Sequence, residues 1–252
     1  IEKINSEIGI SNERIQNNSA NKQRLEAEIL EVKNRIEELK EEQKQKLALE
    51  VAKKANDGDV IGFGSGSTSF LTVLKIAEKI KEENIRIIAI PTSYEIKMLC
   101  NYLEIPTVTI LEKKPDWSFD GVDEIDKNNW MIKGRGAAMF REKLNIANAK
   151  KTYILVDNSK FVSRPCEKFP IPIEVFPDSL YAVKEKLLEL GATSLELRLA
   201  KKKDGPVITE NGNLIIDAKF ENVDETFEKK LKSIVGVIET GLFIGYKVEI
   251  IN

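Results

Sequence analysis

The sequence predicts an α/β fold with a mostly parallel sheet, a second β-α-β-β-α-β domain, and a long coiled-coil helix in front of both. Over the first 42 residues, which contain no proline, apolar residues recur with heptad spacing. Short apolar runs then alternate with amphipathic helical stretches, and this order changes after a proline-marked stretch at 165–177. We therefore expect a coiled-coil extension, a first α/β domain and a second domain, at 1–42, 43–168 plus 245–252, and 169–244.

The heptad stripe predicts a coiled coil that needs a partner helix. With Ile1 at position a, most core positions are apolar and three are polar. The alternative, a single charged helix on the surface, could hardly stay helical without packing its stripe. The stoichiometry and direction of the coil stay open. The core positions are Ile1, Ile4, Ile8, Ser11, Ile15, Asn18, Lys22, Leu25, Ile29, Val32, Ile36 and Leu39.

The first α/β domain is expected to begin with a helix that ends in an Asn-Asp-Gly-Asp turn. Because helices separate the strands, the strands should pair in parallel through right-handed crossovers. The expected helices cover 43–56, 67–83, 93–103 and 137–149, and the expected strands cover 60–64, 85–90, 107–111, the start of 118–126 and 152–157.

The second domain is expected to follow the split βαβ order. A hairpin connection between its two middle strands is indicated by the stretch "DGPVITENGN". We expect the last residues, 246–251, to return to the first sheet. The expected strands cover 171–176, 193–200, 213–220 and 236–243, and the helices 179–190 and 223–233.

Composition excludes several kinds of chemistry. A net charge of −2 gives no general attraction to nucleic acid or to an anionic membrane, and no apolar run is long enough to span a bilayer. The two cysteines lie far apart in the sequence, so a reduced, cytoplasmic protein is expected. There is no histidine, which excludes Ser-His and Cys-His nucleophile pairs. Acid–base chemistry near neutral pH must therefore use a carboxylate or a lysine with a shifted pKa.

The stretch "VIGFGSGSTSF" (60–70) has the composition of an anion-binding loop. A strand leads through glycines and hydroxyl residues directly into a helix, whose first amides point at one place. The stretch lacks the lysine of a P-loop and the glycine spacing of the dinucleotide fingerprint. Taken alone, a Ser/Thr helix cap on a glycine-rich turn explains it equally well.

The stretch "DGVDEID" places Asp120, Asp123, Glu124 and Asp126 within seven residues. If these carboxylates converge, the pKa of at least one must rise, because they cannot all be ionised cheaply. An exposed acidic turn is the plainer alternative. A Mg²⁺ site held by one or two of the acids also stays open, although their order does not fit an EF-hand loop.

The stretch "KGRGAAMFREK" (133–143) predicts a second anion-receiving turn at the start of a helix. Lys133 and Arg135 place cations beside it, and Glu142 falls near the edge of the helix's buried face. The alternative is that Arg141, Glu142 and Lys143 form only the charged side of the helix. Lys160, just after another strand, could likewise be a surface lysine.

All of these features follow the carboxyl ends of expected parallel strands, where α/β sheets place their sites. A phosphate anchor, a carboxylate base and a lysine that stabilises an oxyanion suit proton abstraction next to a carbonyl. An aldose–ketose isomerase needs these groups and no nicotinamide, metal or other cofactor.

With these motifs in this order, the chain resembles ribose-5-phosphate isomerase of type A from about residue 44 to residue 252. The resemblance is carried, in order, by "GFGSGST", "DGVDEID", "KGRGAAMFREK", "VDNSK", "FPIPIEVFP", "NGNLIID" and "GVIETGLF". It implies a Rossmann-like catalytic domain and a ferredoxin-like domain that mediates oligomers. It also implies a pentose 5-phosphate substrate, a dimer or tetramer, and no metal. The coil has no counterpart in the family.

The resemblance also implies the roles of site residues. Glu142 is expected to move a proton between C2 and C1, and Lys133 to stabilise the enediolate oxygen. Asp120 and Asp123 are expected to contact sugar hydroxyls and help open the ring. Ser65 replaces a common threonine, and Arg135 an often-found glycine. The expected substrate-binding residues are Lys44, Ser65, Gly66, Ser67, Thr68, Asp120, Gly121, Asp123, Lys133, Gly134, Arg135, Gly136 and Lys160.

Two other functions compete with the isomerase. One is a non-catalytic module that binds a sugar phosphate, of the kind attached to bacterial repressors. Such repressors carry a basic winged helix upstream, whereas residues 1–42 show mixed-charge heptads, which argues against DNA binding. The other is a coiled-coil assembly protein that uses this fold as a carrier.

Overall fold

The computed structural model describes the backbone of residues 2–252 and the side chains of residues 22, 23 and 25–252. The chain forms two compact units, residues 1–43 and 44–252. The expected separate helix over 43–56 is wrong in its limits, because one helix, α1 (Glu2–Ala52), continues through this stretch. No glycine or proline lies between Leu39 and Leu47 to end it. The change in the apolar pattern there marks the point where α1 enters the core, at the buried Leu47, and not a helix end.

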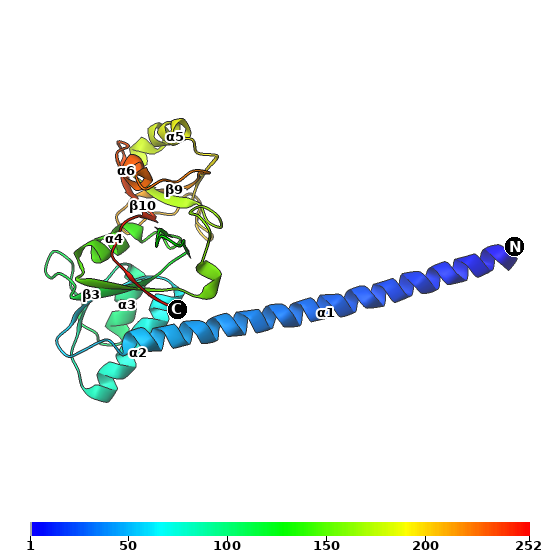
Figure 1. Ribbon diagram of the computed structural model, residues 1–252, viewed down its shortest axis with the longest axis horizontal. Coiled ribbons are helices and arrows are strands. Elements are labelled where there is room, and N and C mark those ends of the chain that lie inside the picture. Colours follow the sequence, from blue (N-terminus) through cyan, green and yellow to red (C-terminus); the bar gives the residue numbers. More distant parts are fainter. Residues whose placement is uncertain (1) are drawn as a thin grey trace. The chain divides into compact units, whose positions relative to one another are not determined.

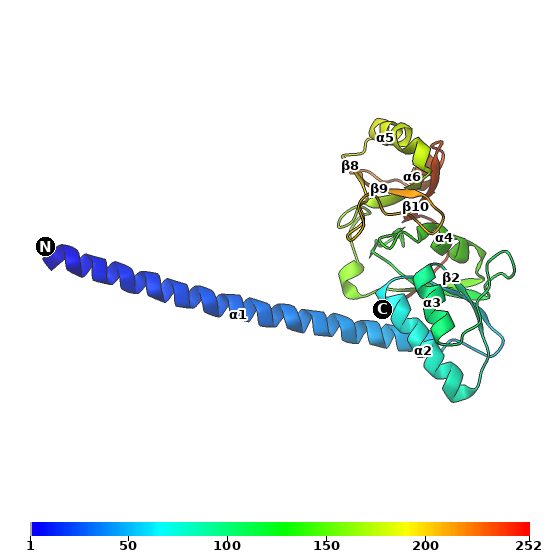
Figure 2. The same ribbon diagram turned by 180° about the vertical axis from the view of Figure 1, so that it is seen from behind.

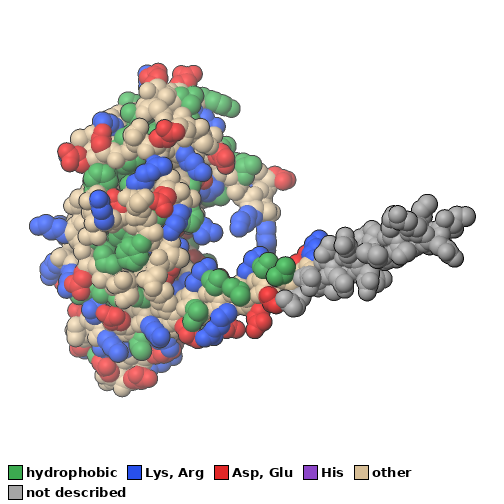
Figure 3. Space-filling model, turned by 45° about the vertical axis from the view of Figure 1, so that its right-hand side comes forward, with side chains coloured by type: hydrophobic (Ala, Val, Ile, Leu, Met, Phe, Trp, Pro, Cys, Tyr) green, Lys and Arg blue, Asp and Glu red, His purple; other side chains and the backbone are tan. Residues whose placement is uncertain are grey.

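The heptad stripe is exposed where the structure describes its side chains. Leu25, Ile29, Val32, Ile36 and Leu39 are 46–58% exposed, and hydrophobic side chains alternate with charged ones along this part of α1 (Figure 3). The core positions from Ile1 to Asn18 lie outside the residues whose side chains are described. The partner helix therefore stays a prediction. Among the described helices, none combines the length and apolar character needed to cross a membrane.

Residues 44–252 contain a parallel five-stranded sheet (Figure 1). Its strand order, β12-β6-β3-β1-β2, confirms the expected parallel sheet and the return of the C-terminal residues to it. The expected strand at 107–111 is wrong: Thr107 makes one isolated bridge, and Thr109 donates its amide to the Glu112 side chain, which turns the chain away. The strands are β1 (Val60–Phe63), β2 (Ile88–Pro91), β3 (Trp117–Gly121), β6 (Lys151–Leu155) and β12 (Glu249–Ile251).

The two faces of this sheet differ in chemistry. One face is apolar and packs against the end of α1, α2 (Ser67–Glu83) and α3 (Tyr94–Tyr102). Trp117 and Phe119 of β3 point into this core, so the strand's period of two turns Ser118 and Asp120 to the opposite face. There they meet α4 (Met139–Asn148), and this alternation buries Asp120 under the helix that carries Glu142.

An antiparallel four-stranded sheet, in the order β10-β7-β9-β8, lies on the other side of α4. Figures 1 and 2 show α5 (Leu180–Glu189) and α6 (Phe227–Lys232) on the side of this sheet away from α4. Two short 3₁₀ helices, η1 (Asn158–Lys160) and η2 (Pro177–Ser179), lie in the connections. The strands are β7 (Ile171–Val175), β8 (Ser194–Leu197), β9 (Leu214–Lys219) and β10 (Val237–Thr240).

A small three-stranded sheet that the sequence did not predict joins these layers. It consists of β4 (Glu124–Ile125), β5 (Met131–Ile132) and β11 (Leu242–Phe243). The strand expected over 236–243 is therefore broken at Gly241. A Cβ at Gly241 would lie 2.1 Å from the carbonyl oxygen of Lys133, so only glycine allows the backbones to approach this closely. This approach brings the four-stranded sheet next to Lys133.

Candidate active site

The glycine-rich loop sits directly against Asp120. Gly64 donates its amide to the carbonyl of Phe119, and a Cβ at Gly64 would lie 2.3 Å from the Asp120 carboxyl carbon. Gly66, with a φ of 93°, is the N-cap residue of α2. Because glycine has no side chain, no N-cap side chain accepts a hydrogen bond from the first amides of the helix. Ser67 is exposed and Thr68 half-buried at this end of the helix. The loop therefore presents two hydroxyl residues and a helix N-terminus next to a carboxylate.

Two serines of this loop have structural contacts. The Ser65 hydroxyl lies 2.7 Å from Thr92 Oγ1 and donates to Ser93 Oγ at 2.8 Å, which holds the loop to the end of β2. Ser69, which no motif of the sequence singled out, donates its hydroxyl to Asp120 Oδ1 at 3.2 Å. Its position in the first turn of α2, directly after the loop, is the sequence feature that could have indicated this contact. Ser69 thus ties the orientation of Asp120 to the loop.

Lys133 lies between two buried carboxyl groups. Its ammonium is 2.9 Å from Asp120 Oδ2 and 3.2 Å from Glu142 Oε2, and it donates to the carbonyl of Gly121. Lys133 and Glu142 are only 3% and 4% exposed, and Asp120 is equally buried. Apart from this ion pairing, neither of the two carboxyl oxygens has a hydrogen-bond partner of good geometry among the described residues.

The charges in this cluster do not balance, and the pKa values shift accordingly. Burial raises the pKa of Glu142 to about 8; the neighbouring Asp120 adds to this rise and Lys133 opposes it. Burial also raises the pKa of Asp120, again against the effect of Lys133. Burial alone would lower the pKa of Lys133, but the two carboxylates outweigh it and raise that pKa. Two carboxyl groups share one ammonium, so one of them can hold a proton near neutral pH.

Asp123 is fixed by the turn that follows Lys133. Its Oδ2 accepts the backbone N–H of Arg135 at 3.0 Å. Gly134 has a φ of 99°, and a Cβ there would lie 2.9 Å from the Met139 side chain. The exposed Gly136 follows, so the predicted segment bends between Lys133 and α4 with its backbone close to Asp123.

Two further predicted cations converge on one ring. The guanidinium of Arg135 and the ammonium of Lys160 each lie 5.8 Å from the centre of the Phe169 ring. Phe169, their shared neighbour, was not predicted as a site residue from the sequence. Lys44 is half-buried on α1, one turn before the buried Leu47.

The four carboxylates of the acidic stretch 120–126 have different roles: two bind backbone amides of nearby loops and two lie at the candidate site. Glu124 accepts the backbone amides of Cys166, Lys168 and Phe169, and so holds the loop that carries Phe169. Asp126 accepts two amides of its own turn. Only Asp120 and Asp123 of this stretch therefore lie at the site. In the described part of the chain, no three carboxylate or thiol side chains are grouped to hold a metal ion.

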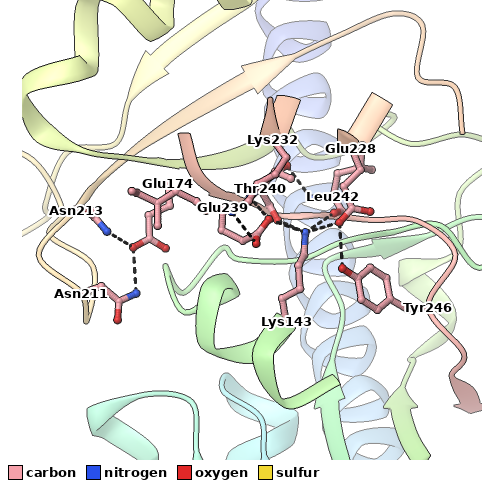
Figure 4. A network of polar contacts seen from close by, with 11 residues as sticks. Lys143, Glu174, Asn211, Asn213, Glu228, Lys232, Glu239, Thr240, Leu242 and Tyr246 are labelled. Carbon is pink, nitrogen blue, oxygen red and sulfur yellow. Dashed lines mark hydrogen bonds and ion pairs between the residues drawn. The ribbon is translucent and has the colours of Figure 1, made fainter. Parts of the chain in front are cut away.

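The charged residues beside Glu142 are not a solvated helix face. Arg141 donates to Asn211 Oδ1 at 3.2 Å and to the carbonyl of Glu210. The buried Lys143 ammonium lies 2.6 Å from Glu228 and 3.1 Å from Glu239, and it donates to the carbonyls of Thr240 and Leu242 (Figure 4). These contacts anchor α4 to the four-stranded sheet while Glu142 points at Lys133.

The chain is similar to known isomerases over nearly all of residues 44–252. The sequence model of the family described as Ribose 5-phosphate isomerase A (phosphoriboisomerase A) matches residues 88–252. Proteins named Ribose-5-phosphate isomerase A from Methanocaldococcus jannaschii and Pyrococcus horikoshii are each 44% identical over 81% of this chain and 90% of their own length.

Solved structures of ribose 5-phosphate isomerases are similar to this chain as well. The ribose 5-phosphate isomerase A of M. jannaschii superposes with a TM-score of 0.80 at 43% identity, covering 83% of this chain and 93% of that one. A D-ribose-5-phosphate isomerase in complex with phospho-erythronic acid superposes with a TM-score of 0.80 at 42% identity, covering 83% and 94%. With the sequence, the fold and these relatives in agreement, the chain belongs to the ribose 5-phosphate isomerase A family.

Proposed function

We propose that the protein interconverts D-ribose 5-phosphate and D-ribulose 5-phosphate. The observation that carries this proposal is the buried cluster of Glu142, Lys133 and Asp120 beside the glycine-rich loop, in a chain of this family. Glu142 removes the proton from C2 of the open-chain aldose and returns it to C1. Lys133 stabilises the enediolate oxygen that forms between these two steps. The hydroxyl proton moves from O2 to O1, so the reaction consumes and releases no other group.

The remaining predicted residues bind the substrate in this proposal. The phosphate lies against Gly66, Ser67 and Thr68 at the N-terminus of α2, with Lys44 as an additional cation. Asp120 and Asp123 contact the sugar hydroxyls. Ser65 supports the loop through Thr92 and Ser93, which is the role its contacts favour. The relative solved with phospho-erythronic acid supports a phosphorylated sugar derivative as the ligand class.

The pH dependence of turnover follows from the raised pKa of Glu142. A general base must be ionised, and the Glu142 carboxyl is mostly protonated below about pH 8. We expect kcat/KM for ribose 5-phosphate to rise about tenfold per pH unit toward that pH and to level off above it, since this parameter reports groups of the free enzyme. Initial rates from pH 5.5 to 9.5, with the fold checked by circular dichroism at each pH, measure this. A kcat/KM that is already constant over this whole range, as for a glutamate with the ordinary pKa of 4.5, would contradict it.

We infer that residues 1–42 assemble the protein through a coiled coil. The exposed stripe at heptad positions a and d supports this, since a helix of this kind is stabilised mainly by packing its apolar face. With the family's second, ferredoxin-like domain also mediating contacts, we expect a homo-oligomer, a dimer or a tetramer.

A matched pair of substitutions tests the coil. Ile29→Asp places a charge on the stripe and should reduce the molar mass measured by light scattering to that of a smaller assembly. Leu30→Asp is the control: Leu30 is similarly exposed, at 59%, but lies off the stripe, and its variant should keep the parent mass. Equal masses for the parent and both variants would show that the coil does not assemble the protein. The kcat/KM of both variants should match the parent if the coil has no catalytic role.

A further inference from the structure

The bend between Lys133 and α4 contains two residues with positive φ, and for one of them, Ala137, this backbone conformation is unfavourable. Gly134 has a φ of 99°, and Ala137, which is not glycine, has a φ of 62°. A non-glycine residue in the left-handed region costs on the order of 1 kcal/mol, so its surroundings must impose the conformation. Residues 134–137 also carry the backbone N–H that binds Asp123. What fixes this segment therefore also affects the proposed substrate site.

Arg198 reaches this segment from the end of β8. Its Nη1 donates to the carbonyl oxygen of Gly134 at 2.8 Å and to that of Arg135 at 3.0 Å. Its Nε and Nη2 donate to the two carboxylate oxygens of Asp217 on β9, the first at 2.8 Å. Both side chains are less than one-fifth exposed. This two-pronged ion pair orients the guanidinium rigidly, because the planar group matches a carboxylate edge.

One peptide unit connects Arg198 to Asp123. The Gly134 carbonyl and the Arg135 N–H belong to the same peptide group, and in a trans peptide they point in opposite directions. Arg198 holds the carbonyl end, and Asp123 Oδ2 accepts the N–H end at 3.0 Å. Arg198 also donates to the Arg135 carbonyl. In that trans peptide the N–H of Gly136 therefore points away from Arg198. Asp123, Arg135, Arg198 and Asp217 also line one cavity of about 550 Å³.

We propose that Arg198, oriented by Asp217, is a positioning residue for the substrate site. It fixes the Gly134–Arg135 peptide and, through that peptide, the carboxylate of Asp123. Most of its donors are used within the protein, so it acts on the sugar indirectly. The four-stranded sheet thereby completes the site, in addition to any role in assembly. This inference rests on the proposed function, because it takes Asp123 as a sugar contact.

A double-mutant cycle tests the proposal. Arg198→Met and Asp217→Asn should each lower kcat/KM about tenfold to a hundredfold, since a shift of about 1 Å in a positioning group costs this much. Asp217→Asn keeps the Arg198 side chain and removes only the carboxylate that orients it. It therefore tests the same role if Arg198→Met fails to fold. In an Asp123→Ala background, Arg198→Met should have little further effect, because the group through which it acts is already absent. Arg164→Met is the control: Arg164 also donates to a backbone carbonyl, that of Glu221, and its variant should match the parent.

The dissociation constant for phospho-erythronic acid, measured by calorimetry on the full chain, gives a readout independent of turnover. It should increase by the same factors as kcat/KM decreases in the binding-impaired variants. Additive effects of Arg198→Met and Asp123→Ala, or a lower melting temperature with unchanged binding and turnover, would overturn the positioning role. If the parent binds phospho-erythronic acid but does not turn over ribose 5-phosphate, the proposed function fails. The double-mutant cycle then still tests Arg198 through the dissociation constants. A parent that does not bind the acid overturns both.

Discussion

Replacing Glu142 with glutamine is expected to reduce kcat by about 10²- to 10⁴-fold, the range found when a general base is removed. Glutamine has the shape of the carboxyl group but cannot accept the C2 proton. Because the raised pKa keeps Glu142 largely neutral at pH 7, the neutral glutamine should preserve the contacts of the free site. The dissociation constant for phospho-erythronic acid should therefore change little. Turnover of ribose 5-phosphate and calorimetry measure the two effects separately.

Glu95→Gln is the matched control for this variant. Glu95 is an exposed glutamate in the first turn of α3, so its replacement should leave kcat within about twofold of the parent, as expected for a surface change away from the site. A Glu142→Gln variant that turns over as fast as Glu95→Gln would remove Glu142 from its proposed role. A variant that loses binding to the same extent as rate would make Glu142 a binding residue.

The largest loss of stability is expected for Lys143→Met. This change removes the buried ammonium and leaves Glu228 without its ion-pair partner, whereas Glu239 keeps Lys232 at 3.2 Å. Breaking one side of a buried ion pair costs about 3–5 kcal/mol, because the remaining charge stays desolvated. The carbonyls of Thr240 and Leu242 lose their donor as well. We expect the free energy of unfolding, measured by chemical denaturation, to fall by about that amount.

A second substitution separates the lost charge from lost packing. Adding Glu228→Gln to Lys143→Met neutralises the unpaired carboxylate and should restore part of the stability. Lys186→Met is the control: its ion pair with Glu189 is exposed on α5 and should contribute no more than about 1 kcal/mol. If Lys143→Met costs no more than Lys186→Met, the buried network does not hold α4 to the four-stranded sheet.

The convergence of Asp120, Lys133 and Glu142 was expected mainly from the resemblance to the isomerase family. Strand positions support it only for Asp120, which ends an expected parallel strand, whereas Lys133 follows the unexpected antiparallel strand β5. The structure brings these three groups together. Their roles in the reaction remain a proposal. The parallel sheet was also predictable, since periodicity and helix signals are local. The strand expected at 107–111 was not correct, because only one bridge forms beside β2 before the contact of Thr109 with the Glu112 side chain turns the chain.

The functions of Arg141, Lys143 and Arg198 could not be predicted. Their partners lie 69–99 residues away for the first two and 19–64 for the third, and a local charge pattern carries no information about such distances. Helical spacing indicated a charged face for Arg141 and Lys143, but the loop before β9, α6 and β10 cover that face. The small three-stranded sheet was missed because two-residue strands leave no period to detect.

The most direct test of the central proposal is turnover by the full chain. Purified protein should convert ribose 5-phosphate to ribulose 5-phosphate, and the reverse, reaching the same equilibrium mixture from either side without added metal or cofactor. The phosphorylated pentoses with other hydroxyl configurations should be slower substrates. Binding of ribose 5-phosphate with no interconversion in either direction would contradict the proposal and would instead favour a sugar-phosphate-binding module.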